Sequence, residues 1–319
     1  MNQFDNLPTI WEEYVNNPII SPPFPSPVIA DPTFLPPEQT HDGLWHLFAH
    51  VALYGFSLFN IIHFVSRDGI KWNRLDGIVS RSSLRPFLFR QQGKYYLAYE
   101  KLIKFLPDYY SQIEIRSSLD LMTWSEPKTI LTPSLSWHKE GTKLGSISNP
   151  CIVSHKDSFR LYYSGGLVYL EDCKFSEPKY IGCAESNNVL GPYISRDYPV
   201  LKPSINDPYV NLGAGSIKVI NLGGVYVGFQ NGIYWDNKKS HSGSSIRMWS
   251  SDDGINWKLV SNIPIIEPGE GWKRSYVYAN DVRITEKGWV MYFNARNGWF
   301  IGSEKIGQAR GYTTPRSAI

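Results

Sequence analysis

Three carboxylates at the ends of predicted strands are the residues best suited to chemistry. Asp31 follows Ile-Ala and precedes Pro-Thr-Phe, Glu100 ends the run Tyr-Tyr-Leu-Ala-Tyr-Glu, and Asp281 follows Tyr-Ala-Asn. Carboxyl groups across a narrow pocket can divide acid and base roles, because mutual repulsion and burial push their pKa values apart. Paired carboxylates of this kind hydrolyse glycosidic bonds. The pattern therefore predicts Asp31 as base or nucleophile, and Glu100 or Asp281 as the acid.

Polar and aromatic residues at comparable strand ends complete a candidate pocket. The predicted substrate-binding residues are His50, Arg85, Asn149, Ser216, Gln230, Asn231, Trp235 and Arg296. Arg85 and Arg296 could hold an anionic group or lower the pKa of a neighbouring carboxylate. Trp235 offers a flat surface on which a ring-shaped ligand can stack. The alternative is that these are solvated strand ends and that Asp31 caps a turn.

The elements that position these residues are short strands that recur along the chain. Each predicted unit begins with a hairpin, and the five hairpins pair 32–35 with 45–50, 86–89 with 95–100, 151–154 with 159–164, 216–220 with 225–230 and 281–285 with 289–294. Outer hairpins with Asp-Gly or similar turns follow, several of them ending in Trp. Four strands repeated five times predict an all-β, five-bladed propeller with antiparallel blades.

The propeller is predicted to form a single domain over 1–319, with a strand near 17–21 closing the ring. In such a ring the inner strands start at one end of a channel, and the second strands return to that end. The candidate residues are therefore expected to meet around one funnel. The alternative, a two-domain β-sandwich, does not explain five evenly spaced hairpin pairs.

Composition excludes several other classes of function. The 319 residues carry a net charge of +3 without a basic block, which argues against nucleic acid as the ligand. The apolar stretch 44–65 contains several His and polar residues, and it is predicted to form two strands rather than a membrane span. The N-terminus lacks the pattern of a signal peptide, which favours a cytoplasmic location.

Neither cofactor nor metal is expected from the sequence. The three cysteines are widely spaced without a C-x-x-C pair, so no zinc or disulfide framework is implied. His41, His46, His50 and His63 crowd the first unit. Without a matching cluster elsewhere they are interpreted as packing or rim histidines.

The segment Ile-Ala-Asp-Pro-Thr-Phe that contains Asp31 resembles the catalytic-base motif of glycoside hydrolase family 43 and its furanosidase relatives. The resemblance implies that Asp31 activates water. Where that family has an Asp that tunes the acid, this chain has Asn149, and where it has the proton-donating Glu-Gly-Pro, this chain has Ala214-Gly-Ser. Both usual carboxylates are therefore replaced.

The sequence thus favours a carbohydrate-active enzyme, most simply a glycoside hydrolase acting on a small carbohydrate or glycoconjugate. The replaced carboxylates leave open a sugar-binding propeller without catalysis. The absence of a secretion pattern leaves open a cytoplasmic sugar transferase or lyase of a biosynthetic pathway.

Overall fold

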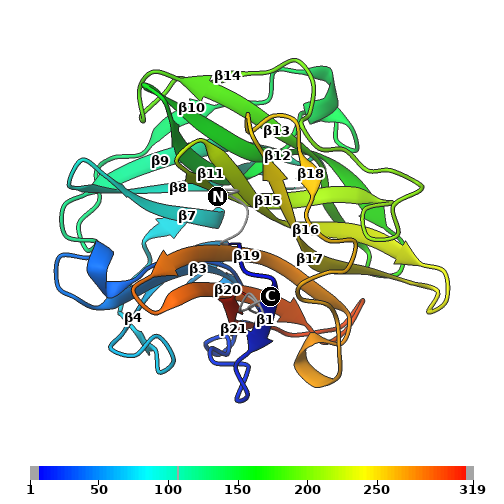
Figure 1. The fold of residues 1–319 in the computed structure, drawn as a ribbon, viewed down its shortest axis with the longest axis horizontal. Coiled ribbons are helices and arrows are strands. Elements are labelled where there is room, and N and C mark those ends of the chain that lie inside the picture. The colour runs from blue at the N-terminus through cyan, green and yellow to red at the C-terminus, as the bar shows by residue number, and fades with distance from the viewer. Residues whose placement is uncertain (1–6, 106–107, 314–319) are drawn as a thin grey trace, which may run out of the picture.

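The computed structural model describes residues 7–105 and 108–313, and over these residues the protein is an all-β molecule. Its strands form four sheets. The largest sheet divides into two antiparallel groups that are joined by one parallel bridge between Ser244 and Tyr276. The regular structure therefore falls into five antiparallel groups in chain order, numbered here first to fifth (Figure 1).

Each group is built from consecutive strands. The first contains β2 (Ile29–Leu35), β3 (Trp45–Tyr54), β4 (Ser57–Ser66), β5 (Asn73–Arg74) and β6 (Ser80–Arg81). The second contains β7 (Ser83–Gln91), β8 (Lys94–Lys104), β9 (Tyr110–Ser118) and β10 (Lys128–Leu131). The third contains β11 (Ile147–His155), β12 (Ser158–Leu170), β13 (Phe175–Ser186) and β14 (Ile194–Ser195). The fourth contains β15 (Gly213–Leu222), β16 (Val225–Asp236), β17 (His241–Ser251) and β18 (Lys258–Leu259).

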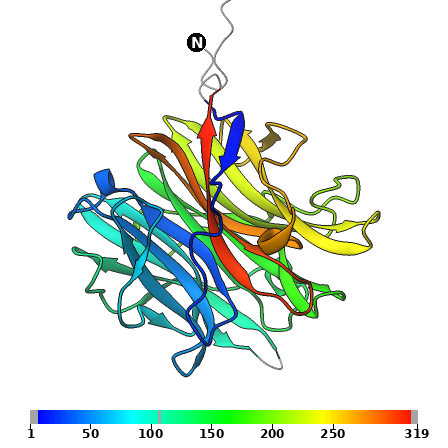
Figure 2. The ribbon, with the colours of Figure 1, turned by 90° about the horizontal axis from the view of Figure 1, so that it is seen from below.

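The fifth group combines the two ends of the described chain. It contains β19 (Tyr276–Thr285), β20 (Gly288–Arg296), β21 (Glu304–Tyr312) and the early strand β1 (Ile10–Glu13), which pairs with β21 (Figure 2). The expected partner near 17–21 contributes only an isolated bridge between Ile20 and Ile306. Three short 3₁₀ helices, Pro37–Gln39, Ser136–Lys139 and Gly271–Lys273, are the only helices in the described part of the chain.

The prediction of four-stranded antiparallel units is confirmed for the second to fifth groups, and the first group has an additional short strand, β6. All five predicted hairpins form, for example β2 with β3 through Phe34 and Leu47. The apolar stretch 44–65 is β3 and β4 joined by a tight turn. No helix among the described residues has both the length and the apolar character needed to cross a bilayer.

The repeated turn before each Trp has a common cause. After β4, the Asp68 carboxylate accepts hydrogen bonds from the backbone N–H groups of Ile70 and Lys71, both at 2.8 Å. Asp120 and Asp253 bond in the same way after β9 and β17. A side chain that satisfies two backbone donors fixes the turn, which explains why this motif recurs in the sequence.

Apolar cores lie between neighbouring groups. One core joins Phe48 and Ile61 of the first group to Leu88 and Leu97 of the second. Further cores join the second, third and fourth groups, and the fourth to the fifth. The fifth group also packs on the first, through residues that include Phe34, Leu47, Val290 and Tyr292.

The first two strands of every group share an irregularity that decides where the site lies. The register of each pair shifts so that two residues of the inner strand oppose one of the second strand. These β-bulges contain Asp31-Pro, Arg85-Pro, Asn149-Pro, Ala214-Gly and Tyr278-Ala. The backbone is left-handed at Asp31, Arg85 and Asn149, with φ of 51°, 52° and 52°. A bulge re-aims a side chain, so these residues leave the normal alternation of their strands.

Candidate active site

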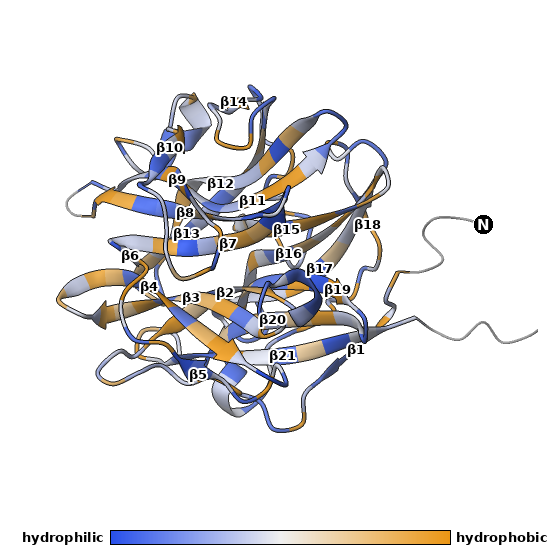
Figure 3. Cartoon of the chain, turned by 90° about the vertical axis from the view of Figure 1, so that its left-hand side faces the viewer, coloured by the Kyte–Doolittle hydropathy of each residue, from blue (hydrophilic) through white to orange (hydrophobic). Residues whose placement is uncertain are grey.

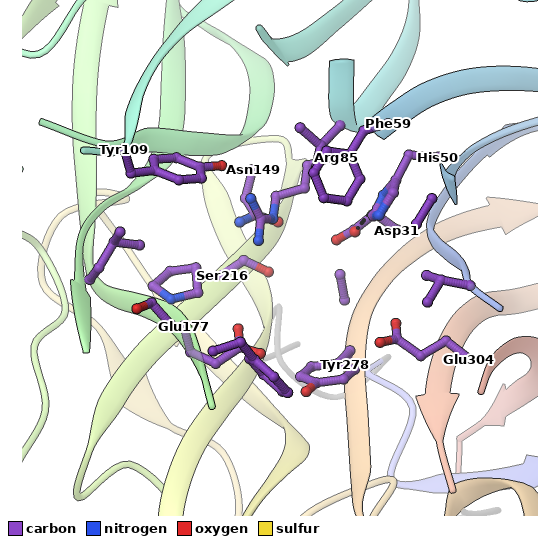
Figure 4. Close-up of a pocket in the computed structure, with 18 of the residues that line it drawn as sticks. Asp31, His50, Phe59, Arg85, Tyr109, Asn149, Glu177, Ser216, Tyr278 and Glu304 are labelled. Carbon is purple, nitrogen blue, oxygen red and sulfur yellow. Dashed lines mark ion pairs between the residues drawn. The ribbon is translucent and has the colours of Figure 1, made fainter. Parts of the chain in front are cut away.

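The bulges of the five groups border one cavity of about 600 Å³ (Figure 4). Asp31, Arg85, Asn149 and Tyr278 line it, as does Ser216 just after the fourth bulge. The predicted residues His50, Asn231 and Arg296 also line the cavity. Side chains from distant parts of the chain therefore meet, because equivalent bulges open toward the same space.

Asp31 is held by neighbours from two groups. Its Oδ2 lies 2.9 Å from Nδ1 of His50 on β3, and its backbone N–H donates to Oδ1 of Asn294 on β20 at 3.1 Å. Burial alone would raise the pKa of Asp31, but the contact with His50 and the charges of Arg85 and Lys218 outweigh it and lower that pKa. Asp31 is therefore an ionised carboxylate at neutral pH.

Glu100 lies behind the cavity wall rather than among the residues that line it. Its side chain is fully buried, and Oε2 accepts from Nη1 of Arg85 at 2.5 Å while Oε1 accepts from the Tyr109 hydroxyl at 2.6 Å. Both carboxylate oxygens are engaged, so Glu100 orients Arg85 and Tyr109, which do line the cavity. The structure gives it the place of a supporting residue and not that of the predicted acid.

Asp281 also lies away from the cavity, and here the sequence-based placement was wrong. The fifth hairpin was predicted to begin at Asp281, but β19 begins at Tyr276, and the register makes Tyr278 the equivalent of Asp31. The Oδ2 atom of Asp281 accepts from Thr33 Oγ1 at 2.8 Å, from the Phe34 N–H at 3.1 Å and from Arg283 at 2.8 Å. Asp281 therefore ties β19 to β2 within the wall.

Two carboxylates that the sequence analysis missed do line the cavity: Glu177 at the start of β13 and Glu304 at the start of β21. Figure 4 shows Glu304 on the same side as Asp31, and Glu177 on the other side. Burial raises the pKa of Glu177 to about 7. The charge of Arg85 opposes this increase, whereas the charges of Glu304 and Asp31 add to it. Burial likewise raises the pKa of Glu304, although Arg296 and His50 oppose the shift.

Hydrogen bonds fix most of the other polar lining residues. Arg296 donates to Oε1 of Glu304 at 3.1 Å and to the Gly298 carbonyl at 2.8 Å. The backbone N–H of Ser216 donates to Oδ1 of Asn231 at 3.1 Å. Gly215 is required here for packing, because a Cβ on it would lie 1.8 Å from the Asn231 carbonyl oxygen. The Asn149 amide donates to the hydroxyl of its neighbour Ser148 at 3.1 Å, and Asn149 lines the cavity.

Two predicted binding residues fall outside the lining. Gln230 is buried, donating to the Ala214 carbonyl at 2.8 Å and accepting from the Trp249 indole at 2.7 Å. Trp235 lies near the end of β16, where its backbone bonds to Asn211. In their place the aromatic lining comes from Phe59, Phe105, Tyr109, Tyr169, Phe175 and Tyr278.

The histidines of the first group form a separate buried pair. His46 Nδ1 lies 2.8 Å from His63 Nε2, and the other ring nitrogen of His46 contacts Asp42 at 3.1 Å. No group of three or more His, Cys, Asp and Glu side chains in the described ranges is arranged to hold a metal ion.

Comparison with known proteins finds a likeness to glycoside hydrolases. The model described as "Glycosyl hydrolases family 43" matches residues 77–210, which is less than half of the chain and excludes Asp31. No curated protein matches. The α-L-arabinofuranosidase from Podospora anserina, in a complex with cellotriose, is similar with a TM-score of 0.66 and 17% identity over 96% of this chain and 98% of that one.

Other solved glycoside hydrolases share the fold. A family 117 enzyme from Zobellia galactanivorans has a TM-score of 0.61 and 14% identity over 96% of this chain and 91% of its own. A thermostable family 43 hydrolase has a TM-score of 0.62 and 17% identity over 90% of each chain. The fold is therefore of the family 43 type, as the resemblance predicted.

Proposed function

We propose that this protein hydrolyses a glycosidic bond in a small carbohydrate or glycoconjugate, with Asp31 as the base and Glu177 as the acid. One observation carries the proposal: two carboxyls lining the same cavity have pKa values displaced in opposite directions. Such a pair supplies a proton donor and a proton acceptor at the same pH.

Asp31 is suited to the base role. His50 and Arg85 keep it ionised, and the Asn294 contact fixes the bulge from which it projects. In the proposed reaction Asp31 takes a proton from a water molecule, whose oxygen bonds to the anomeric carbon as the glycosidic bond breaks. This assignment agrees with the role that the sequence resemblance implies.

Glu177 is suited to the acid role because burial keeps a large fraction of it protonated near pH 7. It gives its proton to the leaving oxygen, a step that contributes about 10²–10⁴-fold in rate in comparable enzymes. Glu177 thus takes the place of the proton donor that is missing at Ala214-Gly-Ser216. The charge of Glu304 raises the pKa of Glu177 further, which makes Glu304 the tuning carboxylate.

This mechanism needs the five groups to surround one cavity. We propose that the five groups are the blades of one five-bladed propeller and one domain, closed where β1 pairs with β21. The core between the first and fifth groups supports this closure. The cavity then opens at one end of the central channel. A cytoplasmic location stays a prediction.

A second candidate, sugar binding without catalysis, is favoured by the two replaced family positions. Asn149 and Ala214 cannot ionise, so neither can take the acid or tuning role of a carboxylate. In that case the cavity would bind a sugar by stacking and hydrogen bonds alone.

One experiment separates the two candidates. The parent protein and Asp31→Asn are assayed against a panel of aryl glycosides, while sugar binding is measured by calorimetry. Turnover by the parent, lost in Asp31→Asn with binding retained, supports the hydrolase. Binding without turnover in the parent supports the second candidate.

A further inference from the structure

An exposed apolar surface adjoins the mouth of the cavity and has no role in the proposed chemistry. It consists of Leu53, Phe56 and Leu58 on the β3–β4 hairpin, and Ile103 and Phe105 at the end of β8, which we call the apolar tip. Phe56 is fully exposed, and the exposed fractions of Leu53, Leu58, Ile103 and Phe105 are 58%, 45%, 52% and 39%. In Figure 3 orange segments alternate with paler and blue ones along the hairpin and the end of β8, which lie on the same side of the molecule.

Ring contacts connect the apolar tip to the cavity. The Phe105 ring lies 6.0 Å from that of Phe59 and 6.2 Å from that of Tyr109. All three residues line the cavity, so apolar surface runs without a break from the tip to the site. A ligand that touches the tip can therefore also reach into the cavity.

Two apolar residues of the tip have an energetically unfavourable backbone conformation. Leu53 and Phe56 have φ of 52° and 62°, in the left-handed region where Gly and Asn are favoured. An exposed bulky side chain in that conformation gains nothing from the folded core. Strain of this kind concentrates at functional sites, where another interaction compensates for it.

Four cations surround the tip. Arg74 donates to the Tyr54 hydroxyl at 2.6 Å, and Arg81 donates to the Gly55 carbonyl at 2.7 Å, both within the hairpin. Lys101 donates to the Arg81 carbonyl at 2.7 Å, and Lys104 lies exposed between the two apolar residues of β8. The acids nearest along the chain are Glu100, which is buried next to Lys101 and paired with Arg85, Asp76, which is exposed beyond Arg74, and Asp108, which lines the cavity.

We propose that the apolar tip docks on an anionic lipid surface, and that the sugar bound in the cavity is the headgroup of a glycolipid. The second part rests on the proposed hydrolase function. Exposed aromatic and aliphatic side chains insert into the interfacial region of a bilayer, while surrounding Lys and Arg are attracted to anionic headgroups. The tip carries both features at the edge of the site, so docking brings a headgroup to the cavity mouth.

Vesicle co-sedimentation tests the docking with the full chain. The parent is expected to sediment with vesicles of phosphatidylcholine and phosphatidylglycerol, less with phosphatidylcholine alone, and less in high salt. The double variant Leu53→Asn/Phe56→Asn should bind about tenfold more weakly, because two inserted side chains are lost. Since Asn tolerates a left-handed backbone, its thermal midpoint should equal or exceed that of the parent.

Matched variants control for loss of apolar surface and charge in general. Ile205→Asn/Ile263→Asn removes two exposed apolar side chains elsewhere and should sediment like the parent. Lys104→Gln should weaken binding to anionic vesicles, whereas Lys156→Gln, on an exposed turn, should not. A parent that does not bind anionic vesicles, or a Leu53→Asn/Phe56→Asn variant that binds like the parent, overturns the proposal. So does sedimentation velocity that shows a parent dimer and a variant monomer, since the tip would then join two copies.

Activity measurements separate a failure of docking from a failure of the hydrolase function. Leu53→Asn/Phe56→Asn should lose turnover of a glycolipid in vesicles while keeping kcat on a monomeric nitrophenyl glycoside. Vesicle binding with no turnover of either substrate refutes the hydrolase and leaves the docking supported. Turnover of the nitrophenyl glycoside without vesicle binding refutes the docking alone.

Discussion

Asp31 and Asp281 stand on adjacent inner strands, β2 and β19, and both have little exposure, yet they have different surroundings. Asp31 projects from a bulge and lines the cavity, with His50 as its close partner. Asp281 lies beyond the bulge of its strand and is closed in by Thr33, Phe34 and Arg283. The residue type is the same, but the Asp31 side chain is 14% exposed and that of Asp281 only 1%, so the position relative to the bulge decides which carboxylate faces a ligand.

The glutamates repeat this contrast. Glu100 is bonded on both oxygens by Arg85 and Tyr109, so its charge is compensated inside the wall. Within residues 7–105 and 108–313 Glu177 forms no ion pair, and it faces the cavity, where burial raises its pKa. A carboxyl without a fixed cationic partner is the one free to exchange a proton with a substrate.

The largest expected effect is on turnover. Asp31→Asn should lower kcat on an aryl glycoside by about 10²–10⁴-fold, because an amide cannot accept a proton from water. Asp281→Asn, its matched control in the wall, should keep most of the parent kcat per folded molecule. Equal losses of kcat in the two variants would remove the distinction between cavity and wall.

The next largest effect is on stability, where replacing Asp281 should have the larger effect and replacing Asp31 the smaller one. Asp281→Ala should lower the free energy of unfolding by about 3–5 kcal/mol, because Arg283 is left without its counter-charge. Urea denaturation measures this value. Asp31→Ala should cost clearly less, since Asp31 borders the open cavity and its loss also removes a desolvated charge. A larger cost for Asp31→Ala would contradict the account.

A smaller effect on stability is expected from His63, a buried residue of β4 in the first group. Burial, aided by the charge of His46, lowers the pKa of His63 to about 3 from its ordinary value of 6.5. Below pH 6.5 the unfolded chain binds a proton at this residue that the folded protein does not. The free energy of unfolding therefore decreases as the pH is lowered from about 6.5 to about 3. The decrease due to this group is on the order of 3 kcal/mol near pH 4.

His63→Gln should flatten that pH dependence. The measurement is the free energy of unfolding at pH 7 and at acidic pH, for the parent and the variant. His241→Gln is the control, because His241 is exposed on 44% of its side chain. If His63→Gln changes stability equally at all pH values, the buried histidine is not the source of acid sensitivity.

Much of the fold could be predicted from local signals. Turn residues and hydrophobic strands located all five hairpins. The bulges were not predicted, although three of them coincide with the Asp-Pro, Arg-Pro and Asn-Pro pairs at Asp31, Arg85 and Asn149. Proline is tolerated there because a bulge interrupts the ladder of hydrogen bonds. The fourth and fifth bulges have no proline, and the fifth hairpin was predicted to start at Asp281 although β19 begins at Tyr276, so Asp281 was misplaced.

The acid could not be predicted in the same way. Glu177 lies in Phe-Ser-Glu-Pro, where β13 pairs with an extension of β12 through Val168. The sequence around it is typical of a turn, and the extension depends on pairing with a distant strand. Glu304 follows Gly-Ser on the third strand of its group and carries no local signal either. Their shared cavity is a consequence of tertiary packing.

The most direct test of the central claim is the pH profile of kcat/KM for the parent and for Glu177→Gln. Since the acid must be protonated, kcat/KM of the parent should fall as pH rises through about 7. Glu177→Gln should lose this alkaline limb, with turnover reduced about 10²–10⁴-fold for an alkyl glycoside and far less for a nitrophenyl glycoside, whose leaving group needs no proton. A variant that keeps the alkaline limb, or that slows both substrates equally, would contradict the assignment of Glu177 as the acid.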